Sequence, residues 1–235
     1  MHTLPVVDYH VHLTDTFTID RAVVLATSRK LKFGIVSHPG ANYGIETDAD
    51  LRAYVDRLHQ FPVYAGLQPV HLGWADAFSD EAIQQLDYVL MDADTVPLDD
   101  GSYLAIWRHD LFIEDMDAFM DRYMNYILQI LTGEPIQIFG RPTFLPINFA
   151  RHHDELWTQD RVTQIIDAAR ERNIALEIQE NIRIPTPEFV TLAKKAGIKF
   201  TFGTNARNHN AGNLKYCLET AQACGLTEDD MFLVN

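Results

Sequence analysis

Leu-Pro-Val-Val-Asp-Tyr-His-Val-His-Leu, residues 4–13, has the pattern of a buried β-strand that ends in polar groups. Side chains alternate between the two faces of a strand, so Asp8, His10 and His12 are expected on one face, opposite an apolar face. Two imidazoles separated by one residue can reach one cation together, and neutral imidazole is the commonest protein ligand for zinc and similar metals. The stretch therefore predicts a polar site at the end of the first strand.

Strand-like and helix-like segments alternate along the rest of the chain. This alternation predicts a parallel sheet with crossover helices, and in 235 residues a closed TIM-like barrel of seven or eight units is the leading solution. A doubly wound open sheet is the alternative. The chain is interpreted as one domain, residues 1–235, although its length also allows two. The further expected strands are residues 33–38, 62–68, 88–94, 135–141, 174–179, 199–205 and 231–234, and the expected helices are 18–30, 48–58, 79–86, 116–131, 160–172, 186–197 and 214–224.

The composition limits the classes of partner. A formal net charge of -14 argues against a general affinity for nucleic acid or anionic membranes, because both need an excess of Lys and Arg. Cys217 and Cys224 lie seven residues apart on one expected helix, too far for a disulfide. With no leader-like or membrane-spanning run, we expect a cytoplasmic protein that binds a small anionic molecule, of unknown oligomeric state.

A polar residue stands at or next to the end of each of the first seven expected strands. The carboxyl ends of the strands in a parallel barrel meet at one mouth, so these side chains are expected to converge there. Such convergence is costly unless the groups bind one another, a metal or a polar ligand. The strand ends are His12, His38, Gln68, Asp94, Arg141, Gln179 and Asn205, and His10, Asp92, Glu177 and Arg207 lie two positions away from them.

Two connections, residues 95–115 and 142–159, are longer than a barrel requires. Both follow strands and both are rich in aromatic residues and histidines, among them Trp107 and Phe144. Long loops at the carboxyl end of a barrel often form lids or substrate walls, so we expect them beside the site. The alternative is that they only cover the end of the barrel.

Several motifs resemble those of the PHP (polymerase and histidinol phosphatase) family of metal-dependent phosphoesterases. Asp8-Tyr9-His10-Val11-His12 resembles the first motif of that family, and the strand ending in Ser37-His38 resembles the second. Residues 86–94, 138–142, 176–178 and 202–207 stand where later motifs are expected. The resemblance implies a distorted seven-stranded (β/α)7 barrel that holds up to three divalent metals and hydrolyses phosphate esters.

The sequence departs from that family at several ligand positions. Gln68 stands where a glutamate is expected, and Asp94 and Arg141 stand where histidines are expected. Asn205 and Arg207 replace an Asp and a His. Arginine remains protonated and cannot donate to a cation. The resemblance therefore implies at most a reduced site, one Zn, Mn or Fe ion or none, with candidate ligands His10, His12, His38, Asp15 and Asp94.

Three functions follow from these residues. The first is a metal-dependent phosphoesterase in which Asp94 or Glu177 acts as base and Arg141 or Arg207 stabilises developing charge. The second is a non-catalytic relative that binds an anionic small molecule or a protein. The third is an amidohydrolase-like metal hydrolase. For the first two, the expected ligand contacts are Gln68, Arg141, Gln179, Asn205 and Arg207, unless the two arginines pair internally with Asp92, Asp94 or Glu177.

Overall fold

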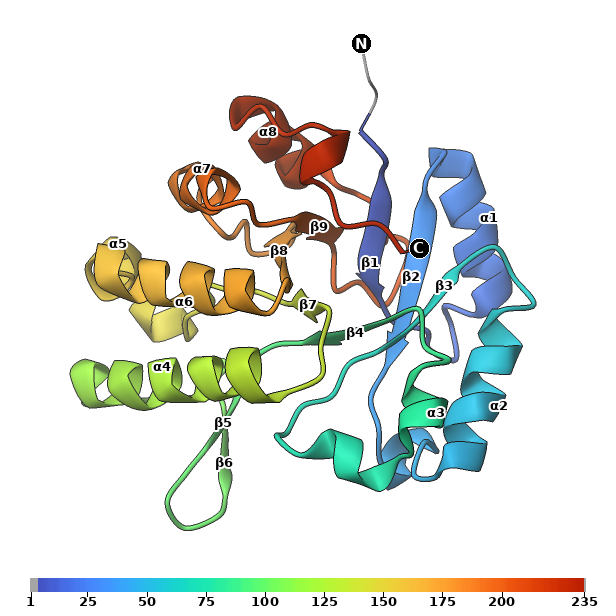
Figure 1. The fold of residues 1–235 in the computed structure, drawn as a ribbon, viewed down its shortest axis with the longest axis horizontal. Helices are drawn as coiled ribbons and strands as arrows, with labels where there is room; N and C mark the ends of the chain where they lie inside the picture. The colour runs from blue at the N-terminus through green and yellow to red at the C-terminus, as the bar shows by residue number, and fades with distance from the viewer. Residues whose placement is uncertain (1–3, 235) are drawn as a thin grey trace.

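The computed structural model describes residues 4–234, and its central feature is a closed barrel of seven parallel strands (Figure 1). β1 pairs with β2 on one side and with β9 on the other, which closes the barrel. The predicted closed barrel is therefore confirmed over the open-sheet alternative. In spatial order the strands are β1 (Val7–Val11), β2 (Lys32–Ser37), β3 (Tyr64–Leu67), β4 (Tyr88–Met91), β7 (Ile138–Phe139), β8 (Ala175–Gln179) and β9 (Phe200–Gly203).

Helices surround the barrel, with α1 to α3 on one side of the view and α4 to α8 on the other (Figure 1). Several begin at a side chain that accepts a hydrogen bond from the first helical turn, as Thr47, Asp115 and Thr186 do. Within residues 4–234, no helix combines the length and apolarity required to cross a membrane. The helices are α1 (Ile19–Arg29), α2 (Asp48–Leu58), α3 (Asp80–Ile83), α4 (Met116–Gly133), α5 (His153–Leu156), α6 (Gln159–Glu171), α7 (Pro187–Lys195) and α8 (Lys215–Ala223).

The two long connections have structure of their own. The first contains a two-stranded antiparallel hairpin, β5 (Thr95–Pro97) with β6 (Tyr103–Ala105), which projects beyond the barrel (Figure 1). The second contains a 3-10 helix, η3 (Ile147–His152), followed directly by α5. Since each follows a barrel strand, β4 or β7, both begin at the carboxyl end of the barrel.

The lower interior of the barrel is filled by an aromatic side chain. Tyr88 is buried, and its hydroxyl donates to the Tyr9 carbonyl oxygen at 2.6 Å. Its ring lies against Gly34 and Gly66, where any Cβ atom would collide with the ring. Glycine at both positions therefore leaves room for a packed apolar floor below the polar mouth.

β1 departs from the regular alternation that the sequence predicted. Its register against β2 shifts between Asp8 and Val11. The Asp8 carboxylate turns toward the loop after β9, where it accepts from Thr204 and Gly212, instead of sharing a site with His10 and His12. An irregular register turns a side chain away from the face expected for it. The prediction that Asp8 lies on the same face as His10 and His12 was therefore wrong.

The expected strand at residues 231–234 is also absent as a strand. Met231 makes only an isolated bridge to Phe200, and the Phe232 N–H donates to the Phe200 carbonyl oxygen. The segment is too short to extend the ladder.

Candidate functional site

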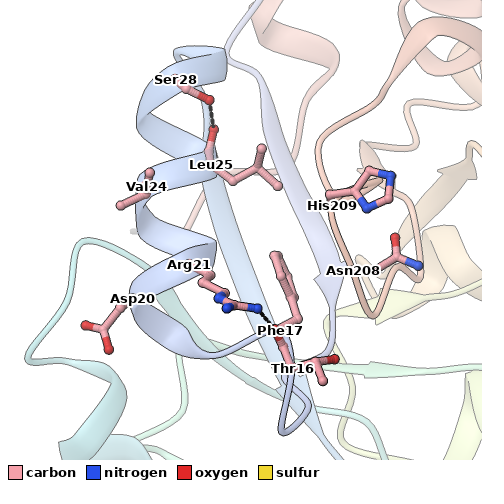
Figure 2. Close-up of a pocket in the computed structure, with 9 residues that line it drawn as sticks. All are labelled: Thr16, Phe17, Asp20, Arg21, Val24, Leu25, Ser28, Asn208 and His209. Atoms are coloured by element: carbon pink, nitrogen blue, oxygen red, sulfur yellow. Dashed lines mark hydrogen bonds between the residues drawn. The ribbon is translucent and has the colours of Figure 1, made fainter.

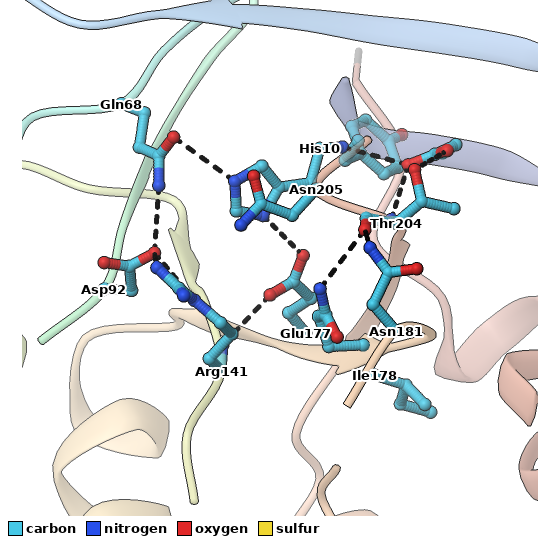
Figure 3. Close-up of polar contacts among 12 residues, drawn as sticks. His10, Gln68, Asp92, Arg141, Glu177, Ile178, Asn181, Thr204 and Asn205 are labelled. Atoms are coloured by element: carbon cyan, nitrogen blue, oxygen red, sulfur yellow. Dashed lines mark hydrogen bonds and ion pairs between the residues drawn. The ribbon is translucent and has the colours of Figure 1, made fainter. Parts of the chain in front are cut away.

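Five residues form a closed ring of hydrogen bonds at the carboxyl ends of the strands (Figure 3). His10 Nδ1 lies 2.8 Å from Glu177 Oε1, and His10 Nε2 lies 3.2 Å from Gln68 Oε1. Gln68 Nε2 donates to Asp92 Oδ2 at 2.9 Å, and this oxygen also accepts from Arg141 Nε at 3.1 Å. The Arg141 backbone N–H completes the ring by donating to Glu177 Oε2 at 2.9 Å. We call these five residues the polar ring; all of them are buried.

The polar ring constrains which of its members donate and which accept. Burial raises the pKa of Asp92, but the Arg141 charge and the hydrogen bonds to Asp92 together outweigh burial and lower the pKa. Asp92 therefore accepts, and Gln68 must turn its NH2 group toward it. Gln68 Oε1 then faces His10, and both ring nitrogens of His10 face oxygen acceptors. Both contacts are hydrogen bonds only if His10 carries two protons or Glu177 carries one.

The charge of Arg141 is balanced inside the protein. Its guanidinium donates to Asp92 and, at 2.6 Å, to Asp94. Burial alone would lower the pKa of Arg141, but the two carboxylates reverse the shift and raise it. Burial, with the charge of Asp92, raises the pKa of Asp94 to about 6. Of the two alternatives that the sequence left open for Arg141, the structure therefore shows internal pairing.

A glycine makes room for the polar ring. Any Cβ atom at Gly203, the last residue of β9, would collide with the Glu177 carboxylate and would lie 2.9 Å from His10 Cβ. Only glycine allows both side chains to approach the backbone of β9 this closely.

The residues present do not fit a divalent metal. His10 has both nitrogens engaged in the polar ring, and Asp94 is engaged by Arg141. Asp15 is exposed. Among residues 4–234, no three His, Cys, Asp or Glu side chains gather in an arrangement that could hold a metal ion. Of the predicted ligands, His10, His12 and His38 lie side by side, with ring centroids 5.4 Å and 5.2 Å apart, but Asp15 and Asp94 do not join them in a metal-binding group.

A second group of side chains lines a cavity of about 220 Å³ near the ends of β1 and β2. His12 and His38 lie in its wall with ring centroids 5.2 Å apart, and Arg207 comes from the loop after β9. Arg57, from α2, also lines it, together with Ser37, Tyr43 and Tyr54. No Asp or Glu lines it among the described residues, and we call it the arginine cavity.

The histidines of the arginine cavity are neutral at pH 7. Burial, together with the His10 charge, holds the pKa of His12 well below its usual value, and burial also lowers the pKa of His38. His12 Nε2 is enclosed and has no hydrogen-bond partner, whereas His38 Nδ1 lies 2.8 Å from the Gln68 carbonyl oxygen. Within residues 4–234, neither Arg57 nor Arg207 forms an ion pair with a carboxylate.

The other predicted ligand contacts have structural roles. The Gln179 amide donates to the Thr204 carbonyl oxygen at 3.3 Å and accepts from the Ile182 N–H at 3.0 Å. Asn205, at a φ of 50°, accepts from Arg207 Nη1 at 3.1 Å. The sequence did not single out Arg57 or Tyr43, because an exposed helix position and a short 3-10 turn carry no pattern that marks a site.

Larger cavities lie outside the arginine cavity. A groove of about 590 Å³ runs between α1 and the loop after β9, lined among others by Asp20, Arg21 and His209 (Figure 2). Arg21 turns onto the Thr16 carbonyl oxygen, and no buried unpaired polar atom lines this groove in the described part of the chain. A chamber of about 620 Å³ between the long connections includes Arg141 in its wall.

Solved structures match the fold of this chain, whereas the sequence comparisons give no match. No protein family model matches the sequence, and no curated protein matches it either. A crystal structure of histidinol phosphate phosphatase from Lactococcus lactis, complexed with zinc, L-histidinol and phosphate, superposes with a TM-score of 0.64 at 17% identity, covering 95% of each chain. An archaeal ribonuclease P with mature tRNA gives a TM-score of 0.43 at 12% identity over 93% of this chain and 90% of the other, too weak to support a conclusion. The chain thus has the fold of a seven-stranded barrel of the PHP type.

Proposed function

We propose that this chain binds a small phosphate-bearing molecule in the arginine cavity and that it does so without a metal. The observation that carries the proposal is the lining of that cavity, which has two unpaired arginines, two histidines and no carboxylate among the described residues. In a chain with a formal net charge of -14, such a local excess of positive charge favours an anion.

The donors of the arginine cavity suit phosphate. A guanidinium presents several N–H groups in a fixed plane and pairs with two oxygens of one phosphate at once. The neutral His38 imidazole already donates its N–H to the Gln68 carbonyl oxygen, whereas His12, whose Nε2 has no partner, has an N–H to offer to a phosphate oxygen. Arg207 comes from a loop, so its guanidinium can move onto a ligand.

Arg141 has a different role from Arg207. The Arg141 charge is already balanced by Asp92 and Asp94, so it adds little net attraction for an anion. In the described structure, Arg207 donates to the Asn205 amide oxygen and forms no ion pair with a carboxylate. Its charge is therefore free to attract an anion, and we assign it the main contact with the ligand.

Calorimetric titration with inorganic phosphate, after dialysis against a chelator, tests this proposal. Arg207→Gln should weaken binding about tenfold or more, the effect expected for one hydrogen bond to a charged group. Arg170→Gln removes the same charge from the exposed Arg170–Asp167 pair on α6 and should leave binding unchanged. Equal losses in the two variants would mean that only the overall charge matters, and no binding by the wild-type chain would refute the proposal.

Hydrolysis of a phosphate ester is the second candidate function. The shared fold with a phosphatase and the position of His12 and His38 at the barrel mouth favour it. Release of phosphate from 4-nitrophenyl phosphate, before and after loading with zinc or manganese, tests it. Release that requires added metal would support a phosphoesterase and would contradict a metal-free site, whereas no release under either condition leaves binding as the function. The amidohydrolase hypothesis has no structural observation in its favour.

A further inference from the structure

A cavity of about 710 Å³ lies among the helices that surround the barrel. Its wall consists of residues from α6, from α7, from the end of α8 and from the connection 142–158. Among the residues that the structure describes, none lines both this cavity and the arginine cavity. Its volume lies in the range of small-molecule sites. We call it the helix groove, and its lining includes Thr143, His153, Trp157, Val162, Phe189 and Cys224.

Three polar atoms in the lining of the helix groove have no hydrogen-bond partner among the described residues. They are Thr143 Oγ1, His153 Nε2 and Trp157 Nε1. Thr143 is 1% exposed and Trp157 is 6% exposed, and His153 Nε2 is itself enclosed. Leaving a buried polar atom without a partner is costly, and most such atoms in proteins have one. A ligand that pairs with these atoms removes that cost.

The three atoms define the hydrogen-bonding groups that a ligand needs. The indole N–H of Trp157 can only donate, and the Thr143 hydroxyl can donate. His153 Nδ1 lies 3.2 Å from Asp154 Oδ1, a carboxylate oxygen that only accepts, so Nδ1 carries a proton. A His153 ring with one proton therefore presents Nε2 as an acceptor. Two donors and one acceptor match the oxygen and the NH2 group of a carboxamide.

The charge of the helix groove disfavours an anion. Asp154 and Glu188 line it, and among the described residues no Lys or Arg does. In a chain with a formal net charge of -14, an anion would meet no compensating charge here. Val162, Phe189 and Leu192 provide apolar lining, which suits a ring or an alkyl chain. The helix groove is therefore suited to a neutral molecule, in contrast to the arginine cavity.

The connection that carries the three unpartnered atoms is held less firmly than the helices beside it. Between residues 142 and 158 its helical segments are only η3 and the four-residue α5. In the described structure no side chain caps the start of either, whereas Thr158 and Thr186 cap α6 and α7. A small shift of this connection therefore breaks fewer contacts than a shift of α6 or α7, and it brings the enclosed atoms onto a ligand.

We propose that the helix groove binds a neutral small molecule that joins a carboxamide to an apolar body. The carboxamide oxygen accepts from Trp157 and Thr143, and its NH2 group donates to His153 Nε2. The apolar body lies against Val162 and Phe189. This site is separate from the one to which we assign phosphate binding, and neither proposal depends on the other.

A half-buried cysteine allows binding to be located as well as measured. Cys224 lines the helix groove, whereas Cys217 is buried and does not line it. 3-Phenylpropanamide is titrated into the full chain by calorimetry, and the rate of Cys224 alkylation by N-ethylmaleimide is followed by mass spectrometry. At about ten times the dissociation constant, the amide should slow this reaction about tenfold, because the free fraction falls by mass action. 3-Phenylpropanoate has the same shape with a negative charge, and it should protect Cys224 only at concentrations at least about tenfold higher.

Two buried threonines provide a matched pair of variants. Thr143→Val keeps the shape of the side chain and removes the hydroxyl, and it should weaken 3-phenylpropanamide binding about fivefold. Thr201→Val makes the same change in β9, at a hydroxyl that is also buried without a partner and does not line the helix groove, so binding should be unchanged. Neither substitution breaks a hydrogen bond of the described structure, so both variants are expected to fold.

Each result supports or overturns the inference. It is overturned if 3-phenylpropanamide does not bind, if it binds without protecting Cys224, or if 3-phenylpropanoate protects equally well. Equal binding by the Thr143→Val and Thr201→Val chains also overturns it. Titration with inorganic phosphate tests the arginine cavity separately, so failure of one proposal leaves the other in place.

Discussion

The side-chain amide of Gln68 donates to the Asp92 carboxylate at 2.9 Å inside the barrel mouth. This contact fixes which end of the amide faces His10, and through His10 it fixes the orientation of Glu177. A single neutral side chain thus joins Asp92 to His10 without adding charge. The polar ring is consequently complete without an ion at its centre.

Replacing Gln68 by glutamate should destabilise the chain. Gln68→Glu places a second carboxylate against Asp92 with no donor between them, and we expect a loss of roughly 3 kcal/mol in the free energy of unfolding, measured in urea. Gln85→Glu makes the same change at an exposed position and should be nearly neutral. A Gln68→Glu chain as stable as the wild type in the presence of a chelator would contradict this account of the polar ring.

Removing Arg141 should be more damaging than removing an exposed arginine. Arg141→Gln leaves Asp92 and Asp94 buried without a counter-charge, so the free energy of unfolding should fall by roughly 3–5 kcal/mol. Arg108→Gln breaks a fully exposed pair with Asp110 and should change the free energy of unfolding far less. Similar losses in the two variants, compared by urea denaturation, would show that the buried pairs contribute no more than a surface pair.

A methyl group at position 203 should disrupt the polar ring by overlap alone. Gly203→Ala forces the Glu177 carboxylate and His10 apart, and we expect a loss of about 1–3 kcal/mol or more, seen as a lower midpoint in thermal unfolding. Gly133→Ala, at the end of α4 with no atom near the new Cβ, should be neutral or slightly stabilising. An unchanged midpoint for Gly203→Ala would mean that Glu177 is not where the structure places it.

Stability should depend on pH through Asp8. Burial raises its pKa from 3.8 to about 6, although Thr204, Gly212 and His10 donate to it. A raised folded-state pKa gives stability that is complete below pH 4 and is lost as the pH rises toward 6. Relative to Asp8→Asn, the wild-type chain should therefore lose roughly 2 kcal/mol between pH 4 and 6. Urea denaturation of both chains across this range measures the difference, and parallel pH profiles would contradict the assignment.

The sequence predicted the barrel well because the fold depends on repeated local patterns. Segments such as residues 48–58 have the caps and periodicity that the structure uses in α2, and every barrel strand overlaps an expected one. The bulge in β1 escaped prediction, because a register shift against β2 leaves no mark in residues 4–13 themselves.

The sequence predicted where these polar side chains gather, but not which of them bind one another. The sequence placed all five residues of the polar ring at the mouth of the barrel. Whether Arg141 contacts a ligand or Asp92 depends on the distance between its side chain, after β7, and Asp92, after β4, and the sequence does not contain that distance. Arg57 lies on an exposed helix face, where arginine is ordinary, so its place in the arginine cavity followed only from the packing of α2 beside β2.

The central claim is that phosphate recognition at this mouth needs no metal, and one titration tests it most directly. Methylphosphonate is titrated by calorimetry into chelator-treated chain and into the same chain after addition of one equivalent of zinc. The account predicts binding in both samples, with dissociation constants that agree within about twofold. Binding that appears only after zinc is added would contradict it.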